Sequence, residues 1–219
     1  GLVASGKTTV YNAVTASGAA SYDGSEMHRI IVNVPDPRIQ ALAEMYNPAR
    51  TIPATMQLVD IPGLATDAAT KSGQSSRLLK HIKDVDVLLH IVRCFQVAGA
   101  SAEHSGIDPA GDVETIDLEL MVADSQTLEN KIARLSRKLK ASDSDDVREV
   151  ADCEKVKQEL DQGIPARRQG LDARGLDSVR ECNLVSLKPV LYIANLDSMG
   201  DEGNDCVKAF QLTVDADGS

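Results

Sequence analysis

The sequence is poor in aromatic residues, basic charge and long apolar runs, and each scarcity argues against a class of protein. It has no Trp and only two Phe among 219 residues, so a surface that stacks nucleic-acid bases is not expected. The net charge is −10, which argues against DNA or RNA binding by bulk electrostatics, although a local basic face stays open. No apolar run reaches the roughly 18 residues of a membrane span, so no membrane association is expected.

Cysteine is also scarce, and its spacing is uninformative for metal binding. The four cysteines, at positions 94, 153, 182 and 206, form no C-x-x-C pair. This spacing argues against a zinc site or a disulfide framework and fits a reducing compartment. With no signal peptide visible, we expect a cytoplasmic protein.

The first eight residues form the most informative motif. Gly1-Leu-Val-Ala-Ser-Gly-Lys-Thr8 fits G-x-x-x-x-G-K-[ST], a loop whose backbone N–H groups surround phosphates. Lys7 is expected to reach the β- and γ-phosphates as a catalytic cation, and the Thr8 hydroxyl is expected to bind Mg²⁺. The alternative is a glycine-containing turn before an ordinary helix. Nucleotide contacts are predicted for Gly1, Ala4, Ser5, Gly6, Lys7, Thr8 and Thr9.

A second motif, Asp60-Ile-Pro-Gly63, ends an apolar stretch about 50 residues later. A carboxylate at the end of a strand beside the phosphate loop can hold Mg²⁺, and the Gly63 N–H can meet the γ-phosphate. Asp-x-x-Gly alone is equally compatible with a plain turn, and its position after a phosphate loop makes it informative. The two motifs together predict a Mg²⁺–nucleotide site.

Leu64 follows that glycine, where Ras-type GTPases carry the glutamine that orients the attacking water. Leucine cannot orient water, so hydrolysis is expected to be slow or to use another group. His104, in the glycine-containing loop 94–111, is the candidate for that group. The alternative is an ordinary solvated histidine.

The apolar pattern predicts an α/β fold of the Rossmann-like P-loop type, with a mainly parallel sheet covered by helices on both faces. A phosphate loop normally follows a central strand, so we expect the sequence to be a fragment that lacks its first strand. Expected helices are 8–17, 37–46, 78–83 and 205–211; expected strands are 29–34, 55–60, 85–92 and 186–195, with another beginning at 211–214.

Residues 112–162 lack any strand signal and carry two helical apolar stripes, which predicts an inserted antiparallel hairpin. Its stripes are Leu128, Ile132, Leu135 and Leu139, then Val147, Val150, Cys153, Val156 and Leu160. The predicted domains are 1–111 (P-loop NTPase, first part), 112–182 (hairpin) and 183–219 (P-loop NTPase, second part). The hairpin tip carries Arg134, Arg137, Lys138 and Lys140, which is either a solvated surface or a contact with RNA or a ribosome.

These motifs resemble those of the YchF/Obg-like ATPase family, a branch of the Obg-related translational P-loop NTPases. The resemblance covers most of the chain. Besides residues 1–9 and 11–13, it rests on Pro35-Asp-Pro-Arg38, Val59-Asp-Ile-Pro-Gly-Leu64, Val92-Arg-Cys-Phe95, Ile107-Asp-Pro109, Leu187-Lys-Pro189 and Tyr192-Ile-Ala-Asn195. It implies an Mg²⁺-dependent ATPase with GTP as the weaker nucleotide, a ribosomal partner, and a C-terminal TGS-type domain outside this sequence.

The family reads the base with N-x-x-E, where GTPases use N-K-x-D. Asn195 and Leu196 match the first two positions, Ser198 departs from both patterns, and Asp197 is a candidate replacement. A serine cannot pair with guanine as a carboxylate does, so strong GTP selectivity is not expected.

The predicted switch segments also depart from the family. Gly24, beside Ser25, stands at the position of a metal-binding threonine, and Asp67, Lys71 and Ser75 replace glycines.

Three functional hypotheses remain open from the sequence. The first is a slow ATPase that acts as a nucleotide-controlled switch on the translation machinery. The second is a nucleotide-gated binding module with negligible hydrolysis, or a GTP-binding protein. The third, a small-molecule kinase, is disfavoured by the Asp60 motif and the inserted hairpin.

Overall fold

A computed structural model describes residues 1–15, 28–61, 81–95, 107–138, 144–197 and 205–217. The chain divides into two compact units, one of Gly1–Ser5 with Leu64–Ser219 and one of Gly6–Gly63. The predicted domain boundaries 1–111, 112–182 and 183–219 follow a different division and stay a prediction. No helix in the described part of the chain is both long enough and apolar enough to cross a lipid bilayer.

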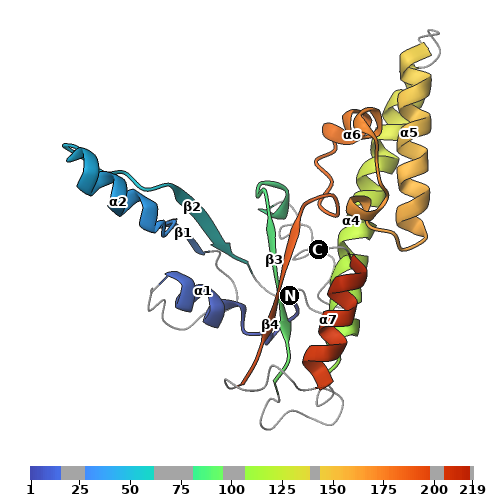
Figure 1. Ribbon diagram of the computed structural model, residues 1–219. Coiled ribbons are helices and arrows are strands. Elements are labelled where there is room, and N and C mark those ends of the chain that lie inside the picture. The colour runs from blue at the N-terminus through green and yellow to red at the C-terminus, as the bar shows by residue number, and fades with distance from the viewer. Residues whose placement is uncertain (16–27, 62–80, 96–106, 139–143, 198–204, 218–219) are drawn as a thin grey trace. The chain divides into compact units, whose positions relative to one another are not determined.

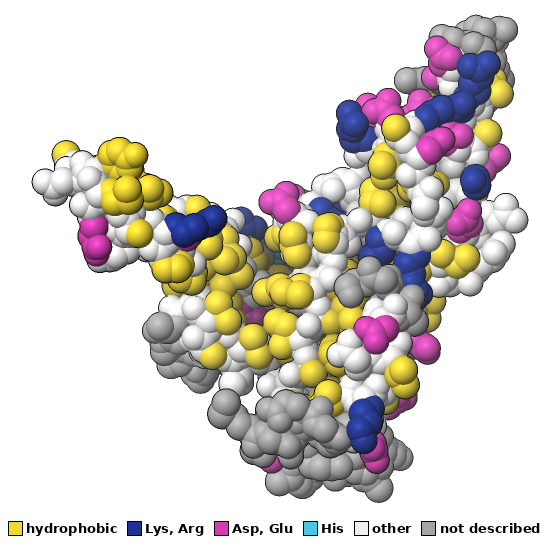
Figure 2. All heavy atoms as spheres, viewed as in Figure 1, with side chains coloured by type: hydrophobic (Ala, Val, Ile, Leu, Met, Phe, Trp, Pro, Cys, Tyr) yellow, Lys and Arg dark blue, Asp and Glu magenta, His cyan; other side chains and the backbone are white. Residues whose placement is uncertain are grey.

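The Gly6–Gly63 unit contains α1 (Lys7–Thr15), β1 (His28–Asn33), α2 (Pro37–Tyr46) and β2 (Thr55–Asp60). β1 and β2 pair antiparallel, with His28 opposite Asp60. Helix α2 has the predicted bounds because Pro37 starts it and the Asp36 carboxylate accepts the Arg38 N–H at 3.0 Å. Figure 2 shows hydrophobic side chains gathered over α2 and these strands.

The other unit contains a parallel pair, β3 (Leu88–Arg93) and β4 (Val190–Asn195). Helix α7 (Asp205–Asp217) packs on this pair through a cluster of Val92, Cys94, Val113 and Phe210. The predicted strand beginning at 211–214 is wrong, because these residues continue α7. Cys206, Phe210 and Val214 are spaced by four residues and all pack on the cluster, which is a helical pattern.

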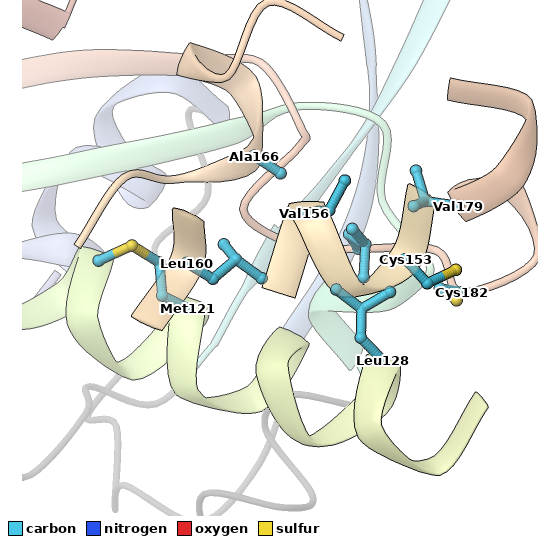
Figure 3. Close-up of a cluster of buried hydrophobic side chains, with 9 residues drawn as sticks. Met121, Leu128, Cys153, Val156, Leu160, Ala166, Val179 and Cys182 are labelled. Atoms are coloured by element: carbon cyan, nitrogen blue, oxygen red, sulfur yellow. The ribbon is translucent and has the colours of Figure 1, made fainter. Parts of the chain in front are cut away.

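The inserted hairpin consists of α4 (Pro109–Lys138) and α5 (Ser144–Asp161), followed by the short helices η3 (Ala166–Arg168) and α6 (Ala173–Arg180). Figure 3 shows side chains from all four helices meeting in one apolar cluster, with Leu128 and Cys153 fully buried. This packing confirms the predicted pairing of the two stripes.

Three details of the hairpin and its neighbouring strands differ from the sequence prediction. α4 begins at Pro109 rather than at 112, because the Asp108 carboxylate accepts the Gly111 N–H at 3.0 Å and caps the first turn. Val147 belongs to the predicted buried stripe but is 54% exposed. The predicted strands 85–92 and 186–195 begin later, at Leu88 and Val190, because the residues before them form turns that carry other contacts.

Candidate nucleotide-binding site

The phosphate-loop residues Gly1–Ser5 lie against the β3–β4 pair. A Cβ placed on Gly1 would collide with the Ile91 carbonyl oxygen, so only glycine fits there. Ala4 has a φ of 61°, in the left-handed region, and Ser5 is 1% exposed. Such a loop directs successive N–H groups to one side, as in phosphate-binding nests.

Asn195 connects this loop to the carboxyl end of β4. Its side-chain amide donates a hydrogen bond to the Ser5 carbonyl at 3.0 Å. Asn195 is also the parallel register partner of Arg93, so both strands end at the same edge. In open α/β sheets, ligands bind beyond the carboxyl ends of the strands.

The Gly6–Gly63 unit holds the other part of the loop. Gly6 has a φ of 85°, and α1 begins at the next residue. The first N–H groups of a helix have no partner within it and favour an anion at that end. The sequence therefore folds here into the turn and helix start that a phosphate requires.

Thr8 and Asp60 meet within this unit, as the two motifs predicted. The Thr8 hydroxyl donates to the Asp60 carboxylate at 2.8 Å, and Asp60 is 5% exposed. Burial lowers the pKa of Lys7 from 10.5 to about 8, against a smaller raising effect of the Asp60 carboxylate. Burial and the same carboxylate also raise the pKa of Tyr11, one turn further along α1.

The donor set of Thr8 and Asp60 fits Mg²⁺. Magnesium binds oxygen ligands and uses one or two carboxylates together with nucleotide phosphates. The hydroxyl and carboxylate oxygens already lie within hydrogen-bond distance of each other. Among the described residues, no group of three or more His, Cys, Asp and Glu side chains could hold a metal without such a phosphate.

The remaining predicted site residues lie in different surroundings. Leu196 packs against the Val92–Phe210 cluster, and Asp197 is exposed in the bend that follows. Thr9 lies exposed in the first turn of α1. Gly63, His104 and Ser198 lie outside the described residues.

Sequence reasoning missed two features of the Gly1–Ser5/Leu64–Ser219 unit, the Asn195–Ser5 bond and the left-handed Ala4, and one of the Gly6–Gly63 unit, the pairing of His28 opposite Asp60. Only the last had a sequence signal, because two neighbouring strands joined by a short helix can pair antiparallel.

These features define a P-loop nucleotide-binding protein of the α/β class. A family model described as "50S ribosome-binding GTPase" matches residues 1–150. The solved YchF GTPase of Schizosaccharomyces pombe superposes with a TM-score of 0.79 at 28% identity, covering 98% of this chain and 60% of that one.

Curated relatives agree with this structural match. The ribosome-binding ATPase YchF of Haemophilus influenzae is 38% identical over 208 residues, which are 93% of this chain and 57% of the relative. That of Haemophilus ducreyi is 36% identical over 223 residues, with coverage of 100% and 61%, and that of Bacillus subtilis is 36% identical, with coverage of 94% and 58%. The chain belongs to the YchF/Obg-like family of P-loop NTPases and spans about three fifths of the length of these relatives.

Proposed function

We propose that this chain is the nucleotide-binding part of an Mg²⁺-dependent nucleoside triphosphatase that hydrolyses ATP to ADP and phosphate, with GTP as a weaker substrate. The observation that carries the proposal is the hydrogen bond between Thr8 and Asp60, which joins two motifs 52 residues apart. A bare glycine turn would not require this contact.

Each site residue has a proposed role. The Lys7 ammonium and the loop N–H groups hold the phosphates, and Gly63 contacts the γ-phosphate. Thr8 and Asp60 hold Mg²⁺, which when bound neutralises charge that develops on the phosphate oxygens. Water attacks the γ-phosphorus, the bond to the β-phosphate oxygen breaks, and ADP leaves.

The base is proposed to lie at the Asn195 end of β4. The side-chain amide of Asn195 donates one hydrogen to the Ser5 carbonyl. Its second side-chain N–H and its side-chain oxygen are proposed to contact the base. Ser198 offers no carboxylate to guanine, which supports ATP over GTP. Leu196 faces the apolar cluster, so we assign it a supporting role beneath the base rather than a polar contact.

Slow hydrolysis follows from Leu64, which cannot orient water, and His104 is the proposed substitute. The same leucine favours the second candidate function, a nucleotide-gated binding module with negligible turnover. Measured phosphate release separates the two candidates.

The proposed partner is the ribosome, in the cytoplasm. This proposal rests on the names of the relatives, "ribosome-binding ATPase", and on the projecting hairpin. The hairpin surface is mixed in charge rather than basic: Figure 2 shows acidic and basic side chains interleaved over α5 and α6. On α4, Arg134 already pairs with Glu181 at 3.7 Å. This mixture favours a contact made of several spaced groups over a single basic RNA-binding patch.

The test is a paired titration of ATP and GTP, with and without Mg²⁺, alongside phosphate release. We expect ATP to bind more than about tenfold tighter than GTP, a difference of about 1.4 kcal/mol. Asp60→Asn should abolish the Mg²⁺ dependence. Asp36→Asn is the matched control, because this half-buried carboxylate in the same unit caps α2 and pairs with the Arg38 guanidinium at 2.7 Å, and it has no role in the proposed Mg²⁺ site.

An equal loss of Mg²⁺ dependence in the Asp60 and Asp36 variants would refute the assigned role of Asp60. Tighter GTP would refute the interpretation of residues 195–198. Intact ATP binding without phosphate release would leave the binding-module function in place of the enzyme.

A further inference from the structure

The strands β3 and β4 connect two regions of the Gly1–Ser5/Leu64–Ser219 unit. They pair in parallel from Leu88–Val190 to Arg93–Asn195, a length of about 17–20 Å. At the carboxyl end, Asn195 binds the Ser5 carbonyl of the phosphate loop. The amino ends of both strands point toward the hairpin (Figure 1), and their contacts there are unusual.

The segment that leads into β4 is held by one buried carboxylate on α4. Asp124 is 0% exposed, and its two oxygens accept the backbone N–H groups of Val185 at 2.9 Å and Ser186 at 2.7 Å. Burial raises the pKa of Asp124 even though these hydrogen bonds oppose the shift. A fully buried carboxylate is costly to keep in a fold. An ordinary apolar contact could attach a helix to a loop without that cost.

The segment that leads into β3 is held by the same face of α4. The Lys83 ammonium donates to the hydroxyl of Thr127, three residues after Asp124. The Lys83 carbonyl in turn accepts from the Asn183 amide at 2.7 Å and from the Lys188 ammonium at 3.0 Å. Lys188 also donates to the Val85 carbonyl at 2.6 Å. Both lead-in segments are therefore bonded to each other and to one turn of α4.

We propose that Asp124 is a positioning residue that couples the helical hairpin to nucleotide binding, with the β3–β4 pair as the connecting element. This inference rests on the proposed nucleotide binding at the phosphate loop. A ligand that orders Ser5 and Asn195 restrains β4, and β4 restrains the segment bonded to Asp124. Coupling between two sites is reciprocal. If bound nucleotide stabilises the Asp124 contacts by a certain factor, loss of those contacts must weaken nucleotide binding by the same factor.

A merely structural Asp124 would predict something else. Its replacement would loosen the hairpin and lower overall stability, but the nucleotide affinity of the folded protein would not change. The decisive readouts are therefore the affinity of the folded variant and the amide exchange of Val185 and Ser186 with and without nucleotide.

The experiment uses the whole chain with ADP as the probe. We expect ADP to slow the exchange of the Val185 and Ser186 amides at least fivefold, in line with typical coupling factors. The internal control is the Gly175 amide of α6, which donates to the carboxylate of the N-cap residue Asp172. Its exchange rate should change less than about twofold. Exchange rates that are the same with and without ADP at all three amides would overturn the proposal.

Asp124→Asn should weaken ADP binding at least fivefold, again the lower end of typical coupling. Asp152→Asn is the matched control, because that α5 carboxylate accepts hydrogen bonds from Arg174 and Ser178 within the hairpin region and should leave affinity within about twofold. If Asp124→Asn does not fold, Thr127→Val removes the Lys83 contact and should weaken ADP binding in the same direction.

The outcomes separate the coupling from nucleotide binding itself. Absence of ADP binding by the unaltered chain would refute the proposed function, and the coupling with it. Normal ADP binding by both the Asp124 and Thr127 variants would refute the coupling alone.

Discussion

Raising the pH from 7 to 9 should weaken nucleotide binding, because the cation that meets the phosphates loses its charge in this range. Burial lowers the pKa of Lys7 to about 8 in the nucleotide-free protein. A bound triphosphate places negative charge beside the ammonium and raises its pKa again. Binding is therefore strongest below pH 8 and declines as the pH rises through that value.

The size of the effect follows from the titration of one group. About nine in ten Lys7 side chains are charged at pH 7 and about one in ten at pH 9. The phosphates contribute little change of their own, because a terminal phosphate with a second pKa of about 6 is already ionised. The apparent Kd for ATP should thus rise about tenfold, which corresponds to about 1.4 kcal/mol.

The assay is a titration of ATP at half-unit steps between about pH 6.5 and about pH 9.5, roughly half a unit beyond each end of the range in which Lys7 loses its charge, without Mg²⁺ and at constant ionic strength. Lys7→Arg is the informative control, because a guanidinium stays charged throughout and should give a flat profile. Lys7→Met should bind weakly at every pH. The lowered pKa of Lys7 also affects the free energy of unfolding, which changes with pH in the opposite direction to ATP affinity. The unfolded chain holds this proton up to a pKa of 10.5, so this group makes folding more favourable as the pH rises from 8 to 10.5.

A flat profile for the unaltered protein between pH 7 and pH 9 would refute the reasoning. It would mean either that Lys7 keeps its charge despite burial or that the ammonium does not meet the phosphates. A decline shared by Lys7→Arg would assign the titration to another group.

Two further pairs of substitutions test the packing of the hairpin region and the phosphate loop. Arg167→Met should lower the free energy of unfolding by about 3–5 kcal/mol, because it removes the guanidinium that pairs at 2.7 Å with the largely buried Asp117 carboxylate. Arg174→Met removes a more exposed pair of 3.1 Å with Asp152 and should cost less than about 1 kcal/mol. Equal losses of unfolding free energy in urea would contradict this ranking. Gly6→Ala and Gly163→Ala should each lower the free energy of unfolding by about 1–2 kcal/mol, because the two glycines have φ values of 85° and 84°. Only Gly6→Ala should weaken ATP binding in a titration. Unaltered ATP binding by Gly6→Ala would refute the assignment of this turn as a phosphate-binding loop.

Local signals in the sequence predicted a large part of the fold and of the site. Helix 37–46 and strand 55–60 have the predicted bounds, because proline, an aspartate cap and apolar alternation act within a few residues. The pairing of Thr8 with Asp60 was also predictable, because each motif specifies its own position relative to a phosphate. The two motifs therefore indicate their shared chemistry without knowledge of the fold.

Other predictions failed where a distant contact decides the outcome. Residues 211–214 have strand-forming side chains, but packing of Phe210 and Val214 on the β3–β4 cluster keeps them in α7. Val147 has the spacing of a buried residue, yet it stands at the start of α5, where it is exposed. For residues 211–214, tertiary packing outweighed local propensity.

The sequence by itself determined the class of the protein, because a phosphate loop and a metal carboxylate are short patterns whose chemistry depends on local order. Only the tertiary structure could show that Asn195 holds Ser5 across 190 residues and that Asp124 holds Val185 across 61. The physical reason is that a hydrogen bond depends on distance in space, and an isolated Asn or Asp in a sequence carries no mark of the distant backbone group that it will bind.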